Sequence, residues 1–239
     1  MDWTECVDQR LKGWVESSGA SGELKQAAEY ALFSGGKRIR PLCTLALLQD
    51  LGVEPEAGLD AVCSLELVHT YSLVHDDLPC MDNDDFRRGK PSLHKAFSEA
   101  TAVLTGDFFL TLSFEILAGC GTPSLVSILG KAAGARGLIE GQMMDLTHSG
   151  DYVSCSLLKT GALFSAAFAF AGAIANQPVD PLARLGAQYG LIYQWLDDLE
   201  DGDTCVEDMS DEVDAFLEAI SPFKQLQKVL KFPNHVPSF

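Results

Sequence analysis

The residues of this sequence best suited to chemistry are aspartates crowded into a short segment. Five of the ten residues from position 76 to 85 are aspartates, and they follow a strongly apolar stretch with helical periodicity. Neighbouring carboxylates repel one another, and the C-terminal end of a helix disfavours anions. A cation should therefore neutralise this segment. Oxygen ligands without a cysteine pair or spaced histidines favour a hard divalent ion, Mg²⁺ before Ca²⁺.

A second aspartate cluster strengthens this interpretation, because one acidic segment alone could equally be a solvated loop. Asp197, Asp198 and Asp201 follow another apolar helical stretch. Asp197 and Asp201 are four residues apart and therefore share one helix face. Mg²⁺ usually binds a few carboxylates together with water and substrate phosphate. We therefore expect the two clusters to face each other across a cavity and to hold Mg²⁺ ions that bridge a diphosphate.

Two basic clusters predict binding sites for small anions. The first has three cations at positions 37–40, directly after two glycines and at an expected helix start, which is an arrangement that suits anions. The second, at positions 87–90, lies just beyond the first aspartates, and arginine binds phosphate oxygens with paired hydrogen bonds. One diphosphate held through metal and another held by basic side chains would use all four clusters.

Composition excludes several other kinds of partner. The chain has 239 residues and a formal net charge of −17, which disfavours nucleic acid and anionic lipid surfaces. Its seven cysteines include no CxxC pair, which is typical of reduced thiols in a cytoplasmic protein. The richest apolar stretch, 162–175, is short and interrupted, and the N-terminus lacks the features of a secretory signal. We therefore expect no stable membrane anchor.

Helical periodicity runs through most of the sequence and predicts an all-α protein. No window shows the alternation of a strand, and no repeat of solenoid length is found. A single domain is expected over residues 1–239. The expected helices are 23–33, 41–48, 60–75, 96–117, 125–144, 157–175, 181–199 and an acidic helix at 210–220.

In these segments the sequence closely resembles the short-chain trans-polyprenyl diphosphate synthases, specifically the bacterial farnesyl and plant-like geranylgeranyl diphosphate synthases. The resemblance covers the chain from about Leu24 to Asp203 and implies the isoprenoid synthase fold, a helical bundle around a central cavity, in a homodimer. The matching segments, in family order, are GGKRIRP (35–41), LELVHTYSLVHDDLPCMDNDDFRRGKPSLHKAF (65–97), LTGDFF (104–109), GQMMDL (141–146), KTGALF (159–164) and YQWLDDLED (193–201).

The resemblance also implies roles for individual residues. The aspartates that would bind Mg²⁺ and support catalysis are Asp76, Asp77, Asp82, Asp197, Asp198 and Asp201. The allylic diphosphate would contact Arg87, Lys159, Thr160 and Gln194, with Lys159 also catalytic. Isopentenyl diphosphate would contact Lys37, Arg40, His69 and Arg88. In this family bulky residues just before the first aspartate pair limit product length, and here these are Tyr71 and Ser72.

The implied reaction is a head-to-tail condensation. Ionisation of an allylic diphosphate, dimethylallyl or geranyl, gives an allylic cation that isopentenyl diphosphate attacks. The aromatic Tyr71 and the spacing from Asp77 to Asp82 resemble farnesyl diphosphate synthases, and geranylgeranyl diphosphate is the alternative product.

One segment departs from the family pattern. The glycine–lysine–threonine/serine loop of the family is not found after Asp203, and residues 204–239 are atypical. Two other functions therefore stay open: a regulatory or weakly active subunit of a prenyl diphosphate synthase, and a terpene cyclase. The basic cluster at 37–40 counts against a cyclase, which binds only one diphosphate. A purely structural helical protein is disfavoured, because it would leave the clustered acids uncompensated.

Overall fold

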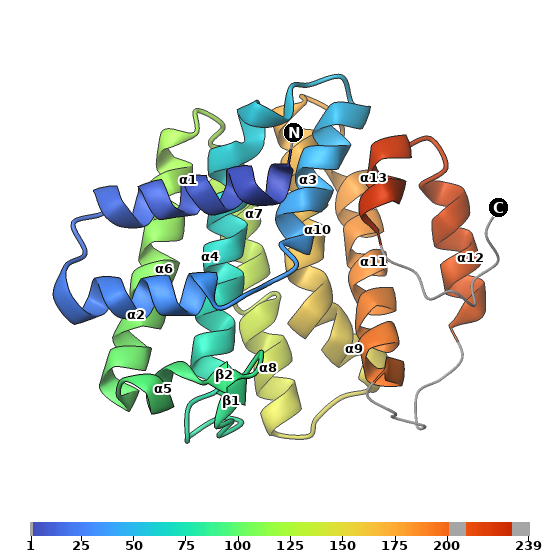
Figure 1. Cartoon of the computed structure of the whole chain (residues 1–239). Helices are drawn as coiled ribbons and strands as arrows, with labels where there is room; N and C mark the ends of the chain where they lie inside the picture. The colour runs from blue at the N-terminus through green and yellow to red at the C-terminus, as the bar shows by residue number, and fades with distance from the viewer. Residues whose placement is uncertain (1, 201–208, 231–239) are drawn as a thin grey trace. The chain divides into compact units, whose positions relative to one another are not determined.

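The computed structural model describes residues 2–200 and 209–230, which form helices joined by loops and one short hairpin (Figure 1). Its packing divides the chain into two compact units. Unit 1 comprises Met1–Pro41 and Leu59–Val126, and unit 2 comprises Leu42–Gly58 and Ser127–Phe239. The all-α prediction is confirmed.

Unit 1 is built around helix α4, which is buried along most of its length. Helix α4 packs along α6, while α1 and α2 pack on each other and both contact α4. The hairpin pairs Phe86 with Pro91 in the loop that follows α4. The elements of this unit are α1 (Trp3–Ser17), α2 (Gly22–Phe33), α4 (Leu59–Asp76), β1 (Phe86–Arg87), β2 (Lys90–Pro91), α5 (Leu93–Ala96) and α6 (Glu99–Gly119).

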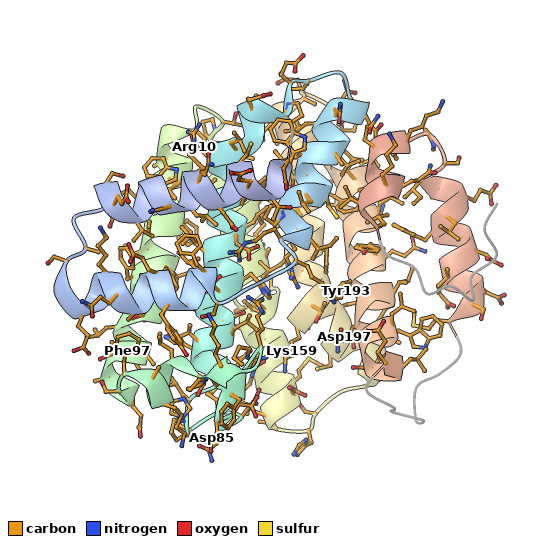
Figure 2. All side chains as sticks on the ribbon, viewed as in Figure 1. Arg10, Asp85, Phe97, Lys159, Tyr193 and Asp197 are labelled. Carbon is orange, nitrogen blue, oxygen red and sulfur yellow. The ribbon has the colours of Figure 1, made fainter. Side chains whose placement is uncertain are left out.

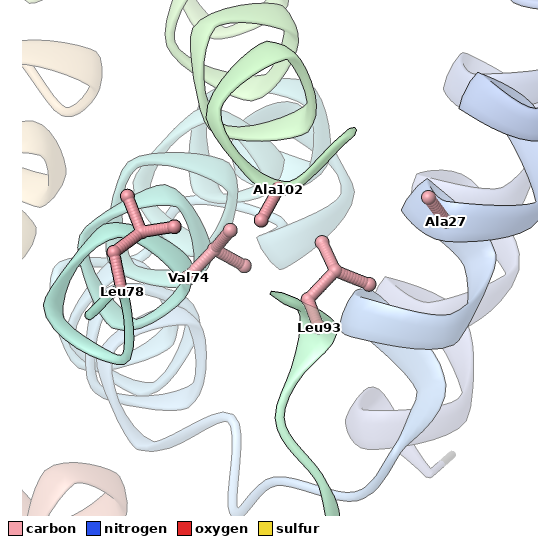
Figure 3. Close-up of a cluster of buried hydrophobic side chains, with 5 residues drawn as sticks. All are labelled: Ala27, Val74, Leu78, Leu93 and Ala102. Atoms are coloured by element: carbon pink, nitrogen blue, oxygen red, sulfur yellow. The ribbon is translucent and has the colours of Figure 1, made fainter. Parts of the chain in front are cut away.

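A cluster of buried apolar side chains anchors the end of α4 that carries the first aspartates. Val74 and Leu78 lie there with Ala27 of α2, Leu93 of α5 and Ala102 of α6 (Figure 3). Burying such side chains supplies most of the packing free energy of a helix end. The apolar cluster therefore holds the neighbouring polar residues at a defined place.

The motif LTGDFF contributes a close contact to the same region. The His75 ring lies against α6 at Gly106, where an added Cβ would be only 2.1 Å from His75 Nε2. The same nitrogen lies 3.1 Å from the carbonyl oxygen of Val103. Only glycine allows this approach, so Gly106 determines how near α6 lies to the residue before Asp76.

Unit 2 is built around α10 and α11, which pack along each other. Tyr189 of α11 sits in an aromatic core, with its ring centroid 5.1 Å from that of Phe164 and 5.6 Å from that of Phe216. The elements of this unit are η1 (Pro55–Gly58), α8 (Leu138–Leu146), α9 (Tyr152–Ser156), the π-helical turn η2 (Leu157–Gly161), α10 (Ala162–Ile174), α11 (Val179–Glu200), α12 (Ser210–Ala219) and α13 (Lys224–Val229). Helices α3 (Ile39–Asp50) and α7 (Ser124–Ala133) contribute residues to both units.

The predicted helix at 125–144 is wrong as a single element. The chain ends α7 at Ala133 and begins α8 at Leu138. A Cβ at Gly137 would lie 2.2 Å from the carbonyl oxygen of Ala132, so this tight break between the helices requires glycine. Helix α1 and the short hairpin were not predicted, whereas the acidic helix expected at 210–220 is present as α12.

Two helical stretches among the described residues are long and apolar enough to cross a membrane by length and composition. They are Glu99–Gly119 and Tyr152–Ile174, and the second is longer than the apolar stretch noted in the sequence because it continues through α9 and η2. Of their most apolar windows, 44% and 61% is buried inside the protein, as in core helices. These stretches are therefore weak evidence for a membrane span.

The packing of α11 on α10 yields a stability prediction. Gly186→Ala should lower the free energy of unfolding by about 1–3 kcal/mol, because the new Cβ would lie 2.4 Å from the carbonyl oxygen of Phe164. Urea denaturation of the purified variants measures this change. Gly13→Ala on α1 is the matched control: nothing lies within 4 Å of its Cβ position. That control should gain about 0.5–1 kcal/mol from helix propensity, and equal effects of the two variants would contradict the packing argument.

Candidate active site

In unit 1 the structure brings together the two basic clusters that lie far apart in the sequence. Arg88 Nη1 donates a hydrogen bond to the carbonyl oxygen of Gly35. Gly36 lies between two guanidinium groups: a Cβ there would be 2.9 Å from Nη1 of both Arg38 and Arg88. Gly35 and Gly36 have φ of 103° and 149°, which side chains rarely adopt. The glycine pair therefore permits the loop to approach Arg88.

Arg38 does not belong to the anion site, which corrects the prediction of three cations there. Its guanidinium is buried and donates to Asp8 Oδ1 at 2.8 Å, Glu66 Oε1 at 2.7 Å and the carbonyl oxygen of Leu32 at 2.5 Å. The pKa of Arg38 is raised, because the nearby carboxylates outweigh the opposing effect of burial. Arg38 thus ties the loop at 35–40 to α1 and α4.

His69 on α4 lies in the field of the clustered arginines. Burial, followed by the charges of Arg40 and Arg88, lowers the pKa of His69 well below its usual value. Arg40 is buried and Lys37 is exposed at the same loop. Of the four residues predicted for isopentenyl diphosphate, Arg40 and Arg88 thus act electrostatically on His69, and Lys37 lies in the loop that Arg88 contacts at Gly35.

The first aspartates differ in their surroundings. Asp77 is buried and accepts hydrogen bonds from Arg87, with 3.0 Å between Asp77 Oδ1 and Arg87 Nε. This bond raises the pKa of Arg87, while burial raises the pKa of Asp77 and the bond to Arg87 offsets part of that effect. Asp76 is partly buried and Asp82 is exposed. The Asp82 amide donates to the carbonyl oxygen of Asp76 at 2.8 Å, so the loop folds back on the helix end.

The two residues predicted to limit product length lie one turn before Asp76. Tyr71 and Ser72 are both buried on α4. The Tyr71 ring packs edge-on against His75 with 5.5 Å between ring centroids. Burial, with a smaller contribution from Asp76, raises the pKa of the Tyr71 phenol.

Unit 2 contains a polar pocket of ≈ 350 Å³ that gathers most of the other predicted residues. Lys159 and Thr160 of η2 line it together with Gln194 and Asp198 of α11. Lys159 belongs to η2, and the exposed Asp197 lies near the end of α11 (Figure 2). Asp201 lies outside the described residues.

Two glycines place the η2 turn inside this unit. A Cβ at Gly141 of α8 would lie 2.3 Å from the backbone nitrogen of Lys159, and a Cβ at Gly190 of α11 would lie 2.5 Å from Gly161 Cα. The turn is therefore held between two helices by direct backbone contact. Single π-helical turns often occur at functional sites, because they reorient side chains within a helix.

Hydrogen bonds connect the polar side chains that line the pocket. Thr160 Oγ1 donates to Gln194 Oε1 at 2.7 Å, and Gln194 Nε2 donates to Asp198 Oδ1 at 2.8 Å. The Tyr152 hydroxyl donates to Asp198 Oδ2 at 2.7 Å. Both oxygens of Asp198 therefore already accept hydrogen bonds within the protein.

Two residues of this pocket that the sequence analysis did not single out bond to predicted ones. Asp145 forms a salt bridge with Lys159 and lies in the GQMMDL segment, where an acid one turn after a glutamine was the available signal. Tyr152 follows a loop of small and polar residues, and no pattern singles it out. Only its hydrogen bond to Asp198, 46 positions further along the chain, identifies it as part of this network.

The described residues contain no group of three or more histidine, cysteine or acidic side chains arranged to hold a metal. The donor set nevertheless fits Mg²⁺, which commonly binds one or two carboxylates and takes its other ligands from water and substrate phosphates.

The Polyprenyl synthetase family model matches residues 21–212. The chain belongs to the polyprenyl synthetase family. Farnesyl diphosphate synthase of Geobacillus stearothermophilus is 40% identical to this polyprenyl synthetase over 215 residues, covering 82% of this chain and 72% of the relative. Geranylgeranyl pyrophosphate synthase 7, chloroplastic, of Arabidopsis thaliana is also 40% identical, over 197 residues, covering 75% of this chain and 57% of the relative.

Solved structures agree with the sequence comparison. Geranyltranstransferase from Thermotoga maritima superimposes on this polyprenyl synthetase with a TM-score of 0.84 and 31% identity, covering 95% of this chain and 94% of that one. An isoprenoid synthase family member from Thermotoga neapolitana gives a TM-score of 0.85 and 33% identity, with 95% of each chain covered. The predicted isoprenoid synthase fold is confirmed.

The environment of His69 yields a pH-dependence prediction. Because the folded-state pKa lies below the unfolded value of about 6.5, the unfolded chain takes up this proton first as pH falls. The free energy of unfolding should therefore fall as the pH drops below about 6.5, by at most ~1.4 kcal/mol per pH unit. Wild type should lose more free energy of unfolding than His69→Gln between about pH 7 and pH 5, as measured by urea denaturation. Parallel losses in the two proteins would contradict a neutral His69.

Proposed function

We propose that this polyprenyl synthetase condenses isopentenyl diphosphate head to tail with an allylic diphosphate, giving farnesyl or geranylgeranyl diphosphate. The observation that carries the proposal is that each unit holds one polar site suited to a diphosphate. The allylic carbon–oxygen bond breaks, the double bond of isopentenyl diphosphate forms the new carbon–carbon bond, and a proton is lost to the released diphosphate. The relatives named above are farnesyl and geranylgeranyl synthases.

In unit 2, Lys159, Thr160 and Gln194 would bind the allylic diphosphate. Lys159 is a flexible cation already balanced by Asp145, so an incoming diphosphate would share or replace that partner. Donors held in place before the reaction stabilise charge that develops on a leaving group. The sequence also predicts that Arg87 contacts the allylic diphosphate, and this stays a prediction; its pairing with Asp77 keeps its guanidinium in a fixed orientation.

In unit 1, Lys37, Arg40, His69 and Arg88 would bind isopentenyl diphosphate. A neutral imidazole among arginines can donate one hydrogen bond to a phosphate oxygen without adding further positive charge. The bond from Arg88 to Gly35 holds the loop and the arginine segment together. Arg38 stabilises the loop that carries Lys37 through its salt bridges with Asp8 and Glu66.

The aspartates that would hold Mg²⁺ are Asp76, Asp77, Asp82, Asp197, Asp198 and Asp201. Bound Mg²⁺ would neutralise the charge that develops on the leaving diphosphate. The carboxylates would act on the diphosphate end of the substrate through the bound ions, because carboxylate and diphosphate repel each other directly. We further infer a cytoplasmic homodimer whose residues 1–239 form a single catalytic domain.

A regulatory subunit without activity is the alternative that the sequence left open. The described residues retain both basic clusters and the polar pocket of unit 2, and nothing in the comparisons favours that alternative. The segment in which the family's glycine–lysine–threonine/serine loop is not found includes residues 204–208, which lie outside the described residues. An active enzyme remains the proposal.

The direct test is incubation with radiolabelled isopentenyl diphosphate, geranyl diphosphate and Mg²⁺, followed by analysis of product chain length. A prenyl product that EDTA abolishes is expected. A folded protein that binds diphosphate and makes no product would instead support the regulatory subunit.

The metal assignment yields a mutational prediction. Asp76→Ala and Asp197→Ala should each abolish turnover while leaving the thermal unfolding transition in place, because each removes a carboxylate expected to hold Mg²⁺. Asp214→Ala, an exposed acid on α12, is the matched control and should retain full activity. Near-wild-type turnover in either of the first two variants would disprove this assignment.

Product length depends on Tyr71 under the same proposal. Tyr71→Ala should shift the products from farnesyl toward longer chains, since the buried ring is the bulky group one turn before Asp76. Tyr71→Phe keeps the ring and should retain the wild-type product distribution, as read by chromatography of the dephosphorylated products. An unchanged distribution in the alanine variant would reject Tyr71 as the limit.

A further inference from the structure

Tyr152 connects the loop before α9 to the aspartate segment of α11. Residues 148–152 line one side of the pocket in unit 2, and Tyr152 is the first residue of α9. Its hydroxyl donates to Asp198 Oδ2, and the side chain of Asp198 is partly buried. This contact lies at the end of a chain of hydrogen bonds that reaches Thr160 of η2.

Asp198 determines which group donates and which accepts at each step of this chain of hydrogen bonds. An ionised carboxylate only accepts hydrogen bonds, so the neighbouring amide must turn its nitrogen toward it. Gln194 accordingly donates through Nε2 to Asp198, and its Oε1 accepts from Thr160. The second hydrogen on Gln194 Nε2 is then left to donate elsewhere, and the Thr160 oxygen keeps its lone pairs.

Tyr152 holds Asp198 in the orientation on which this direction depends. With its phenol on Oδ2, the carboxylate presents Oδ1 to Gln194. Without the phenol, rotation of the carboxylate would release Gln194, and the amide would lose its fixed orientation. Preorganised donors lower the cost of binding an anion, because less side-chain entropy is lost.

We propose that Tyr152 is a positioning residue for the diphosphate of the allylic substrate, acting through Asp198 on Gln194 and Thr160. The inference rests on the proposed function, because it names the support for the same pocket. Tyr152 does not touch the reacting atoms in this account. It determines how the groups that bind the diphosphate are presented.

The test compares Tyr152→Phe with wild type in steady-state kinetics and in calorimetric titration with inorganic diphosphate, with and without Mg²⁺. The variant should raise the KM for geranyl diphosphate and the Kd for inorganic diphosphate by about three- to tenfold, as expected for one lost hydrogen bond. The KM for isopentenyl diphosphate and kcat should stay unchanged. Tyr193→Phe is the matched control, because that ring packs on Phe164 and does not line the pocket.

A second comparison asks whether Tyr152 acts through Asp198. In an Asp198→Ala background, Tyr152→Phe should cause no further change in the Kd for inorganic diphosphate. An equal effect in both backgrounds would overturn the inference, as would an unchanged Kd in the single variant. A parallel rise in both KM values with a lower melting temperature would also overturn it, since that marks a general structural defect.

The two proposals can fail separately. Wild-type protein that forms no prenyl product would refute the proposed function, while the calorimetric comparison would still decide the role of Tyr152. An active wild type with an unaffected Tyr152→Phe variant would refute the positioning role alone.

Discussion

Direct backbone contact around the η2 turn is the constraint on which the pocket of unit 2 depends. Gly141 of α8 and Gly190 of α11 leave no room for a side chain against the turn, so both helices contact it through backbone atoms. This packing presents Lys159 and Thr160 to the residues of α11. A larger residue at either glycine would push apart the elements that carry the hydrogen bonds to Gln194 and Asp198.

In unit 1, ion pairing has a comparable role. Arg38 is buried and bonded to Glu66 and Asp8, so the chain must keep its loop close to α4 and α1. Breaking such a buried pair by removing one partner commonly costs several kcal/mol, whereas the exposed pair of Arg10 and Asp60 is worth little. The cost of leaving charge unpaired therefore keeps the basic loop in place, and Arg88 contacts it there at Gly35.

Much of this arrangement was predictable from the sequence. The apolar periodicity gave most helices, and the Asp76 and Asp197 segments end apolar helices as expected. Prediction was wrong where a residue's type did not reveal its partner. Arg38 looks like any other cation of its cluster, yet its guanidinium is bonded inward. The break between α7 and α8 depends on a clash with Ala132 that periodicity cannot register.

By itself the sequence determined the kind of chemistry and the helices that carry it, because residue types and helical spacing are local properties. It indicated diphosphate binding from clustered acids and cations, and it placed them at helix ends. Only the tertiary structure decided which charges neutralise one another, as with Asp77 and Arg87. The tertiary structure also placed Tyr152 and Asp145 among the residues that line the pocket of unit 2. These outcomes depend on contacts between residues distant in the chain, and their distances and burial are set by packing.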